Sequence, residues 1–307
     1  MHKKNEKITR PPAFRLGIDL GGSKTEVVVL DGDLQVIFRK RVPTPVHEYE
    51  AILTMIVDLV SEASTTLGGR PSVGIGTPGG ISPGTGRLRN SNTRCLNGKP
   101  FQLDIERRLD CAVKLQNDAN CFTLSEALNG AGKGFVTVFG VILGTGTGGG
   151  LVVNRQLLTG PNAIAGEWGH NPLPWVSETD ESTLCYCGKH GCIETYISGS
   201  GLANNFQKRT GVVLSSEQIV LAAQSGDKNC VAAMEIYFDQ LARSLAHVIN
   251  IIDPDAVVLG GGMSNIKEIY RQLPDRLPSY VFSDRVVTPI LPALHGDASG
   301  VFGAAML

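Results

Sequence analysis

Three cysteines lie within eight residues of one another and suggest a metal site. They are Cys185, Cys187 and Cys192. Thiolates bunched in one loop favour zinc, which prefers four ligands, and the fourth could be His170 or His190. Four protein ligands leave no open position for water, so we expect a structural Zn²⁺ ion rather than a catalytic one.

Two glycine-rich turns follow short apolar strands and could bind phosphate groups. Residues 14–31 read as strand, glycine turn and strand, and residues 137–153 repeat this pattern. Glycine lets the backbone approach a ligand closely, so that amide N–H groups can point at phosphate oxygens. A third glycine run, after the apolar segment 256–259, would allow close passage of a flat or sugar-like group. The residues predicted to contact a nucleoside triphosphate are Gly21, Gly22, Ser23, Lys24, Thr25, Gly144, Thr145, Gly146, Thr147, Gly148, Gly260, Gly261 and Gly262.

The second glycine turn also has a formal match to the dinucleotide fingerprint. Gly144, Gly146 and Gly149 have the required spacing, and Glu167 follows about 20 residues later. That fingerprint requires a helix directly after the glycines, whereas the apolar, β-branched residues 151–153 predict a strand. The sequence therefore disfavours an NAD-dependent oxidoreductase, and a Walker A phosphate loop is absent as well.

Two aspartates follow predicted strands, where α/β folds place their ligands. Asp118 lies between a strand over 112–115 and a helix over 119–128, and it could accept the proton of an attacking hydroxyl. The alternative is that Asp118, or Asn117 before it, only caps the helix. Asp19 precedes the first glycine turn, and we expect it to hold Mg²⁺ through water.

The apolar pattern predicts helices and strands that repeat in two halves. Helices are expected over 47–67, 103–109, 119–128, 231–251 and 297–306, and further strands over 72–76, 112–115 and 256–259. Because each half opens with a strand–turn–strand unit, we expect two duplicated α/β domains with a cleft between them. The predicted N-terminal lobe comprises 14–118 and about 294–307, and the C-terminal lobe 119–293, with a zinc loop at 170–194. Residues 1–13 are expected to be a disordered lead.

Composition limits the function further. The 307 residues carry 28 basic and 29 acidic side chains, a net charge of −1, so no global field attracts nucleic acid or a membrane surface. Neither a signal peptide nor a long apolar run is present, and we expect a cytoplasmic protein. The 37 glycines are about 12% of the chain against a usual value of about 7%, and the excess is concentrated in the glycine turns, at Gly79 and Gly80, and in the cysteine loop.

Together these motifs resemble the ROK (repressor, ORF, kinase) sugar kinases, from about residue 15 to the end of the chain. The segments that carry the resemblance are Asp19-Leu-Gly-Gly-Ser-Lys24, Asn117-Asp118, Gly144-Thr-Gly-Thr-Gly-Gly-Gly150, Gly166-Glu-Trp-Gly-His170 and Cys185-Tyr-Cys-Gly-Lys-His-Gly-Cys-Ile-Glu194. Three others look like the bacterial fructokinase/mannokinase branch: His170-Asn-Pro-Leu-Pro-Trp175, Gly80-Ile-Ser-Pro-Gly-Thr-Gly86 and Leu96-Asn-Gly98.

The resemblance implies a two-lobed, actin-like and ribonuclease H-like ATPase fold. It also implies ATP-dependent phosphorylation of the 6-hydroxyl of a hexose, with Asp118 as general base. Ser23 stands where the family usually has threonine, and it keeps the hydroxyl. His170, rather than His190, matches the zinc ligand. The positions that match sugar-contacting residues are Gly79, Gly80, Asn92, Asn117, Asp118, Glu167, His170 and Glu194.

The branch resemblance makes fructose the expected substrate, with mannose or glucose as further ones. The alternatives are an N-acetylglucosamine or N-acetylmannosamine kinase of the same family, and a sugar-binding regulator without catalysis. The family also suggests a homodimer. Its repressor members carry a DNA-binding domain before the first phosphate motif, and with 18 residues before Asp19 we do not expect such a domain here.

Overall fold

The computed structural model describes residues 14–307, so the predicted lead over 1–13 lies outside the described residues. The chain divides into two compact units. One, called unit 1 below, comprises residues 14–117 together with Ala304–Leu307, and the other, unit 2, comprises Asp118–Gly303. The sequence analysis predicted the boundaries between the two lobes after residue 118 and at about residue 294. Each unit contains one five-stranded sheet of its own.

The sheet of unit 1 has the strand order β3-β2-β1-β4-β7. Its strands are β1 (Arg15–Leu20), β2 (Lys24–Leu30), β3 (Val36–Pro43), β4 (Ser72–Thr77) and β7 (Val113–Asn117). β1, β2 and β3 are antiparallel neighbours, whereas β4 and β7 continue the sheet in parallel to β1. The alternating apolar residues of β1 meet those of β2, and Asp19 pairs with Glu26 in the register.

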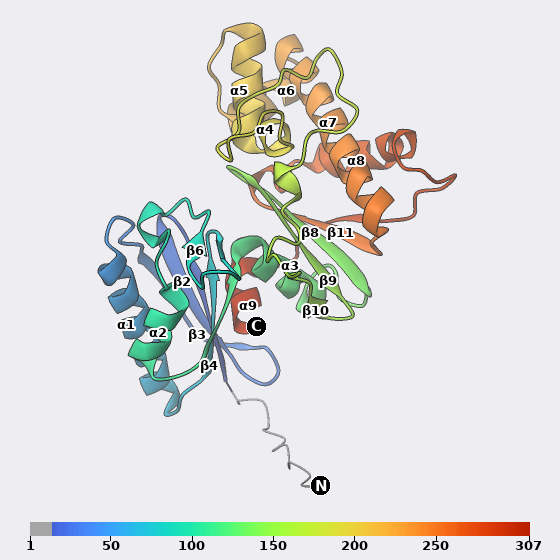
Figure 1. Ribbon diagram of the computed structural model, residues 1–307. Helices are drawn as coiled ribbons and strands as arrows, with labels where there is room; N and C mark the ends of the chain where they lie inside the picture. The colour runs from blue at the N-terminus through green and yellow to red at the C-terminus, as the bar shows by residue number, and fades with distance from the viewer. Residues whose placement is uncertain (1–13) are drawn as a thin grey trace. The chain divides into compact units, whose positions relative to one another are not determined.

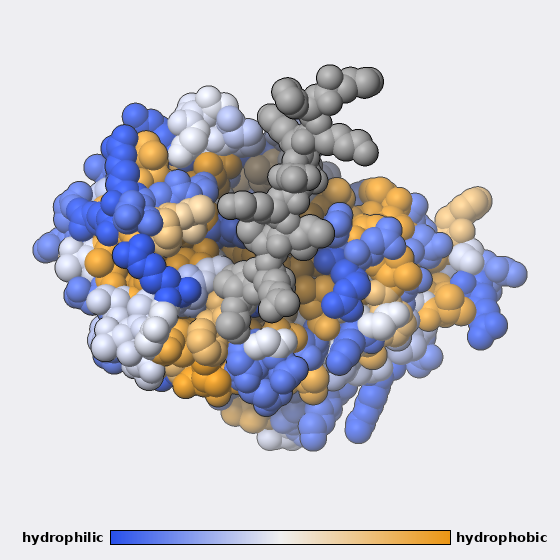
Figure 2. All heavy atoms as spheres, turned by 90° about the horizontal axis from the view of Figure 1, so that it is seen from below, coloured by the Kyte–Doolittle hydropathy of each residue, from blue (hydrophilic) through white to orange (hydrophobic). Residues whose placement is uncertain are grey.

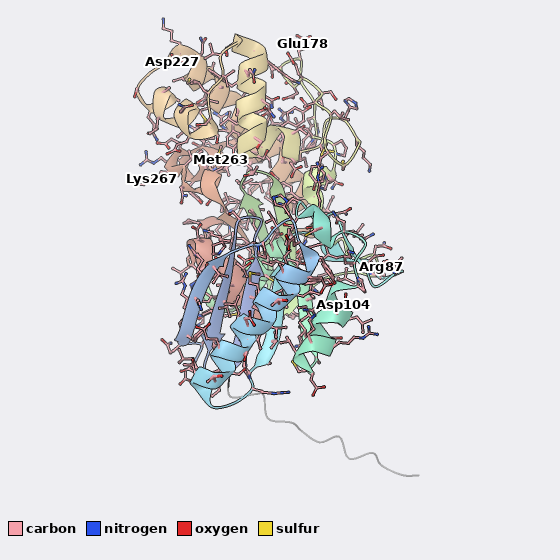
Figure 3. All side chains as sticks on the ribbon, turned by 90° about the vertical axis from the view of Figure 1, so that its left-hand side faces the viewer. Arg87, Asp104, Glu178, Asp227, Met263 and Lys267 are labelled. Carbon is pink, nitrogen blue, oxygen red and sulfur yellow. The ribbon has the colours of Figure 1, made fainter. Side chains whose placement is uncertain are left out.

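Two helices cover a face of this sheet, α1 (Tyr49–Leu67) and α2 (Phe101–Leu109) (Figure 1). The apolar stripe of α1 is buried against the sheet, and the helix ends at Gly68, whose φ of 64° suits a left-handed cap. The Tyr49 hydroxyl donates to Asp104 of α2 at 2.6 Å, which joins the two helices; Figure 3 labels this aspartate. The segment between β4 and α2 contains a small hairpin, β5 (Gly80–Ile81) and β6 (Leu88–Arg89).

The sheet of unit 2 repeats this plan with the order β10-β9-β8-β11-β12. Its strands are β8 (Thr137–Leu143), β9 (Thr147–Val153), β10 (Gln156–Leu157), β11 (Ala256–Gly260) and β12 (Ile290–Pro292). As in unit 1, an antiparallel hairpin begins the sheet and two parallel strands extend it. The same order and the same directions in both sheets indicate a duplicated α/β domain.

Helices cover both faces of this second sheet. α3 (Asp118–Asn129) packs closely against β8, β9 and β11, where glycines face its side chains. The long α7 (Lys228–Ile252) contributes to the core on the other face. The remaining helices of the unit are α4 (Glu194–Ile197), α5 (Gly199–Thr210), α6 (Ser216–Gln224), α8 (Lys267–Arg276) and α9 (Ser299–Ala305), which continues into unit 1 (Figure 1).

The predicted actin-like, duplicated α/β fold class is confirmed by this architecture. The sequence analysis did not identify β3, because this strand is charged and largely exposed at the edge of its sheet. It also did not place α5, α6 and α8. Hydrophilic side chains project from the face drawn in Figure 2, with hydrophobic residues between them. Among residues 14–307, none of the helices has the length and apolar character needed to cross a bilayer.

Candidate functional site

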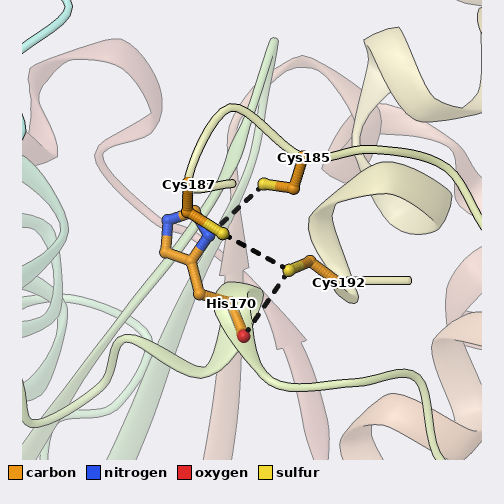
Figure 4. A group of neighbouring side chains, drawn as sticks. All are labelled: His170, Cys185, Cys187 and Cys192. Atoms are coloured by element: carbon orange, nitrogen blue, oxygen red, sulfur yellow. Dashed lines mark hydrogen bonds between the residues drawn. The ribbon is translucent and has the colours of Figure 1, made fainter. Parts of the chain in front are cut away.

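The loop of unit 2 that carries the three cysteines brings them together with His170 (Figure 4). The Nδ1 atom of His170 lies 3.6 Å from Sγ of Cys185, and Sγ of Cys187 lies 3.6 Å from Sγ of Cys192. All four ligand atoms lie within 4.8 Å of one another. His190 is exposed, and the cluster does not include it.

This donor set fits a tetrahedral zinc ion. With Zn–S distances of about 2.3 Å, tetrahedral geometry separates two sulfurs by roughly 3.8 Å, close to the spacings of the cluster. The backbone amide of Lys189 lowers the pKa of the Cys187 thiol, whereas burial raises the pKa of Cys185 to about 12. The cluster therefore has the ligand types and spacing that a closed, structural zinc site requires.

A buried ion pair fixes the segment that joins His170 to the cysteines. Arg243 of α7 donates to both carboxylate oxygens of Asp180, at 2.8 and 3.1 Å, and both side chains are almost fully buried. The same guanidinium donates to the carbonyl oxygens of Pro174 and Trp175, and Gln240 donates to Asp180 at 2.8 Å. These bonds satisfy the buried charges and attach the loop to the long helix.

Glu167 and His170 belong to a segment that packs directly on the second glycine hairpin. A Cβ atom on Gly149 would lie 2.7 Å from Cδ1 of Trp168 and 2.8 Å from the carbonyl oxygen of Gly166. The indole N–H of Trp168 donates to the carbonyl of Gly148 at 3.1 Å. The hairpin glycines therefore set the position of the segment that carries Glu167 and His170.

Glu194 connects the cysteine loop to the tip of the same hairpin. The backbone amide of Thr147 donates to Oε2 of Glu194 at 2.9 Å, and a Cβ atom on Gly146 would lie 2.6 Å from that oxygen. The other oxygen, Oε1, lies 3.8 Å from Sγ of Cys185. Glu194, a predicted sugar residue, thus contacts both a predicted ATP residue and a predicted zinc ligand.

The two predicted ATP segments of unit 2 also lie side by side. A Cβ atom on Gly261 would lie 2.5 Å from the carbonyl oxygen of Leu143 and 3.0 Å from the amide nitrogen of Gly144. The carbonyl of Gly144 accepts from the amide of Gly199 at 2.8 Å, at the start of α5. Gly262 has open space on its Cβ side. Gly144, Gly261 and Gly262 therefore bring partly or fully exposed backbone together at the ends of β8 and β11.

Asp118 lies where β7 ends and α3 begins. Its Oδ1 accepts from the amide of the next residue, Ala119, at 2.8 Å, and the side chain keeps an accessible surface. Desolvation by the surrounding protein raises the pKa of this carboxyl, and the nearby Glu167 carboxylate raises it further. A carboxylate with a raised pKa at a strand end is suited to take a proton from a substrate hydroxyl.

The predicted residues of unit 1 gather around the first glycine turn and the end of β4. The amide of Gly21 donates to the carbonyl of Lys24 at 3.1 Å, and the hydroxyl of Thr44 donates to the carbonyl of Gly21 at 2.9 Å. A Cβ atom on Gly22 would meet nothing closer than Oδ1 of Asn92, at 4.0 Å. Asp19 precedes this turn at the end of β1, and its side chain is half-buried.

The sugar residues predicted in unit 1 follow strand ends in the same way. Gly79 and Gly80 follow β4, with Gly79 at a φ of 81°. Asn117 ends β7 opposite Thr77 in the register, and Asn92 is exposed.

Sequence reasoning did not identify one residue that belongs to this region, Tyr186. Its hydroxyl lies 3.0 Å from Nε2 of His170, and the two rings pack edge to face at 5.1 Å. The signal in the sequence is that Tyr186 lies between two metal ligands, Cys185 and Cys187. When both neighbours point toward the metal position, the side chain between them must point away from it.

Comparison with known proteins identifies the family of this chain. The ROK family profile matches residues 15–307. The N-acetyl-D-glucosamine kinase of Pectobacterium atrosepticum is 42% identical over 296 residues, covering 95% of this chain and 97% of that protein. The enzyme of the same name from Shigella flexneri is 44% identical over 300 residues, covering 95% and 98%.

Solved structures of the same family have the same fold. A ROK hexokinase from Thermus thermophilus superposes with a TM-score of 0.86 at 27% identity, covering 95% of this chain and 97% of that one. A ROK family glucokinase from Streptomyces griseus, in complex with glucose and AMPPNP, gives a TM-score of 0.76 at 28% identity, covering 95% and 98%.

These relatives correct the predicted substrate. The fructokinase reading is wrong, since relatives at 42% and 44% identity are named N-acetyl-D-glucosamine kinases. The three segments used to choose the fructokinase branch are short, and only Gly80 and His170 among their residues were predicted to contact the sugar. The coarser prediction, an ATP-dependent sugar kinase, agrees with the names of these relatives. With a match over nearly its full length, the chain belongs to the ROK family.

Proposed function

We propose that this chain is an ATP-dependent N-acetyl-D-glucosamine kinase, which transfers the γ-phosphate of ATP to the 6-hydroxyl of the sugar. The observation that carries the proposal is the identity of 42–44% over 95% of the chain to relatives of that name. The geometry supports it, because Asp118, Glu167, His170 and Glu194 lie together with a glycine hairpin in unit 2.

In the proposed reaction Asp118 accepts the proton of the 6-hydroxyl while the hydroxyl oxygen attacks the γ-phosphorus. The new O–P bond forms as the bond to the β,γ-bridging oxygen breaks, and ADP leaves. The raised pKa of Asp118 makes its carboxylate a stronger base than an ordinary aspartate, which suits proton transfer near neutral pH. Glu167 and Glu194 accept from the sugar hydroxyls, with His170 beside them, and the glycine turns hold the phosphates.

Magnesium fits the carboxylate of Asp19, which we propose holds the ion through water. Bound Mg²⁺ would neutralise charge that develops on the phosphate oxygens. We further propose that His170, Cys185, Cys187 and Cys192 hold one structural zinc ion, with His170 bound through Nδ1. We also propose that the protein is a homodimer, with a mass of about twice the 32.7 kDa of one chain.

A panel of sugars with ATP tests the assignment. Initial rates of ADP release are measured for N-acetyl-D-glucosamine, N-acetyl-D-mannosamine, glucose, mannose and fructose. We expect kcat/KM to be highest for N-acetyl-D-glucosamine. A higher value for any other sugar, or no ADP release with any of them, would overturn the proposal.

Elemental analysis of the purified protein tests the metal. We expect one zinc per chain in the native protein, and a clear loss of zinc in Cys187→Ser. His190→Gln serves as the control from the same loop, because His190 is exposed and outside the cluster. A fully active preparation without metal would contradict the structural zinc.

A further inference from the structure

Tyr186 is the exposed aromatic residue between two of the cluster cysteines. Its side chain is 74% exposed, yet its hydroxyl is held 3.0 Å from Nε2 of His170. The ring packs edge to face on the imidazole, with an interplanar angle of 86°. An exposed tyrosine would ordinarily be free to turn into solvent, so both contacts with one histidine define a specific position.

The chemistry of His170 determines which atom of this contact donates. Nδ1 faces Sγ of Cys185, and a metal bound there leaves the ring proton on Nε2. The Nε2–H group then donates to the phenol oxygen of Tyr186. Because the phenol oxygen accepts in this contact, the phenol O–H is not used by the histidine and can donate to another group.

The other side chains proposed to hold the sugar in unit 2 are acceptors. Glu167 and Glu194 are carboxylates, which accept hydrogen bonds and cannot donate them when ionised. Oε1 of Glu194 lies 3.8 Å from Sγ of Cys185, the residue before Tyr186. Glu167 directly precedes the short helical turn Trp168–His170, whose histidine contacts the phenol. A tyrosine phenol has an ordinary pKa of about 10, so it is protonated and can donate at neutral pH.

The substituents of a sugar differ in whether they can donate or only accept hydrogen bonds from these side chains. A hydroxyl can donate to a carboxylate, so glucose would be satisfied by Glu167 and Glu194. The carbonyl oxygen of an acetamido group can only accept. The N–H of His170 is directed at Tyr186, and the two glutamates only accept. Among these four side chains, the phenol O–H of Tyr186 is therefore the donor available to such a carbonyl.

We propose that Tyr186 is a specificity-determining residue, whose phenol O–H donates to the acetamido carbonyl of N-acetyl-D-glucosamine. This inference rests on the proposed function and names the residue that would distinguish the N-acetylated sugar from glucose. The zinc loop would hold Tyr186 in place through its two neighbouring ligands, Cys185 and Cys187.

The test is Tyr186→Phe, which keeps the ring and removes only the hydroxyl. Binding of N-acetyl-D-glucosamine and of glucose is measured by calorimetry without ATP, and kcat and KM are measured with each sugar. We expect the affinity for N-acetyl-D-glucosamine to fall about 5–10-fold, the usual worth of one hydrogen bond, with glucose changed less than about twofold. The loss should appear in KM while kcat stays near the wild-type value.

Two controls separate this role from a general loosening of the loop. Zinc content is measured in Tyr186→Phe, and His190→Gln is carried through every assay as an exposed position of the same loop. An equal loss for both sugars, a loss of zinc, or no change for either sugar would overturn the inference. Failure of the proposed function is a different result, because the wild-type protein itself would then not phosphorylate N-acetyl-D-glucosamine.

Discussion

The sheets of the two units have the same strand order and directions, yet their corresponding positions carry different residues. In unit 1 the last parallel strand, β7, ends at Asn117 and is followed by Asp118. In unit 2 the corresponding strand, β12, ends at Pro292 and is followed by Ala293 and Leu294. The duplicated plan provides two equivalent strand ends, and one of them bears the carboxylate that could act as a base.

The two glycine hairpins differ in a similar way. In unit 1 the Cβ side of Gly22 is open, so its backbone stays accessible to a ligand. In unit 2 Gly146 and Gly149 are needed for close packing against Glu194 and Trp168. The same compositional signal, a glycine-rich turn, therefore has two physical causes: the backbone is left open at Gly22, and other site residues pack closely at Gly146 and Gly149.

The largest effect is expected from removing the carboxylate that follows β7 and has no counterpart after β12. Asp118→Asn keeps the shape of the side chain and removes its ability to accept the proton, so we expect kcat to fall at least about 10²-fold. Sugar binding, measured by calorimetry, should remain close to normal. Near-wild-type turnover would show that the two strand ends do not differ in catalysis.

The pH profile of the wild-type enzyme sharpens the same point. Asp118 acts as a base only when deprotonated, and its pKa is raised, so kcat should fall as the pH drops through this raised pKa. The acid limb should lie above the ordinary aspartate value of about 3.9. Asp227→Asn is the matched control: Asp227 also begins a helix, where it caps α7 by accepting from the amide of Cys230 at 2.9 Å (Figure 3). Its kcat and acid limb should be those of the wild type.

The next effect compares a buried carboxylate of each unit. Asp180 faces the buried guanidinium of Arg243, so Asp180→Asn should lower the free energy of unfolding by about 3–5 kcal/mol. Glu26 on β2 faces Arg39 and Arg41, whose side chains are 47% and 42% exposed. Because those charges can turn to water, Glu26→Gln should cost about 1 kcal/mol or less. Urea unfolding of both variants measures the difference, and equal losses would contradict it.

Acid should act on the same ion pair. Burial alone would raise the pKa of Asp180, but hydrogen bonds from Arg243, Gln240 and Ser177 outweigh it and lower the pKa to about 2. An aspartate whose pKa is lower in the folded state stabilises the fold above its unfolded value of about 3.9. This contribution should be lost as the pH falls from about 4 to about 2, and Asp180→Asn should lack that part of the acid response.

The sequence predicted the elements whose patterns are local. Apolar segments on both sides of a glycine-rich turn predicted both hairpins, and one apolar stripe predicted α1. Arg243 shows where this reasoning ends: a charged residue in the predicted helix 231–251 would be assigned to its exposed face, yet it is buried against Asp180, 63 positions earlier. A partner so distant leaves no local pattern.

The candidate site shows the same limit. Spacing predicted the metal cluster, because three of its four ligands lie within eight residues. It left His170 and His190 open until the family resemblance favoured the first, and the structure brings His170 to the cysteines. The sugar was predicted wrongly from short motifs. The position of Tyr186, which we propose as the residue that determines specificity, follows from the folded loop and not from its motif.

The smallest effects compare the hairpins directly, through Gly149→Ala and Gly22→Ala. The new methyl group at 149 would press on Trp168 and on the carbonyl of Gly166, so we expect a loss of about 1–3 kcal/mol in unfolding free energy and weaker sugar binding. At 22 the methyl group meets no protein atom closer than 4.0 Å, and stability should stay within about 0.5 kcal/mol of the wild type. If the open backbone there faces the phosphates, the KM for ATP should rise about 5-fold, equivalent to about one hydrogen bond, with the KM for sugar unchanged.

Thermal unfolding and the KM values for ATP and for sugar distinguish the two variants. A stable Gly149→Ala protein with normal sugar binding, or a Gly22→Ala protein with normal ATP kinetics, would show that the two turns do not divide access and placement between them.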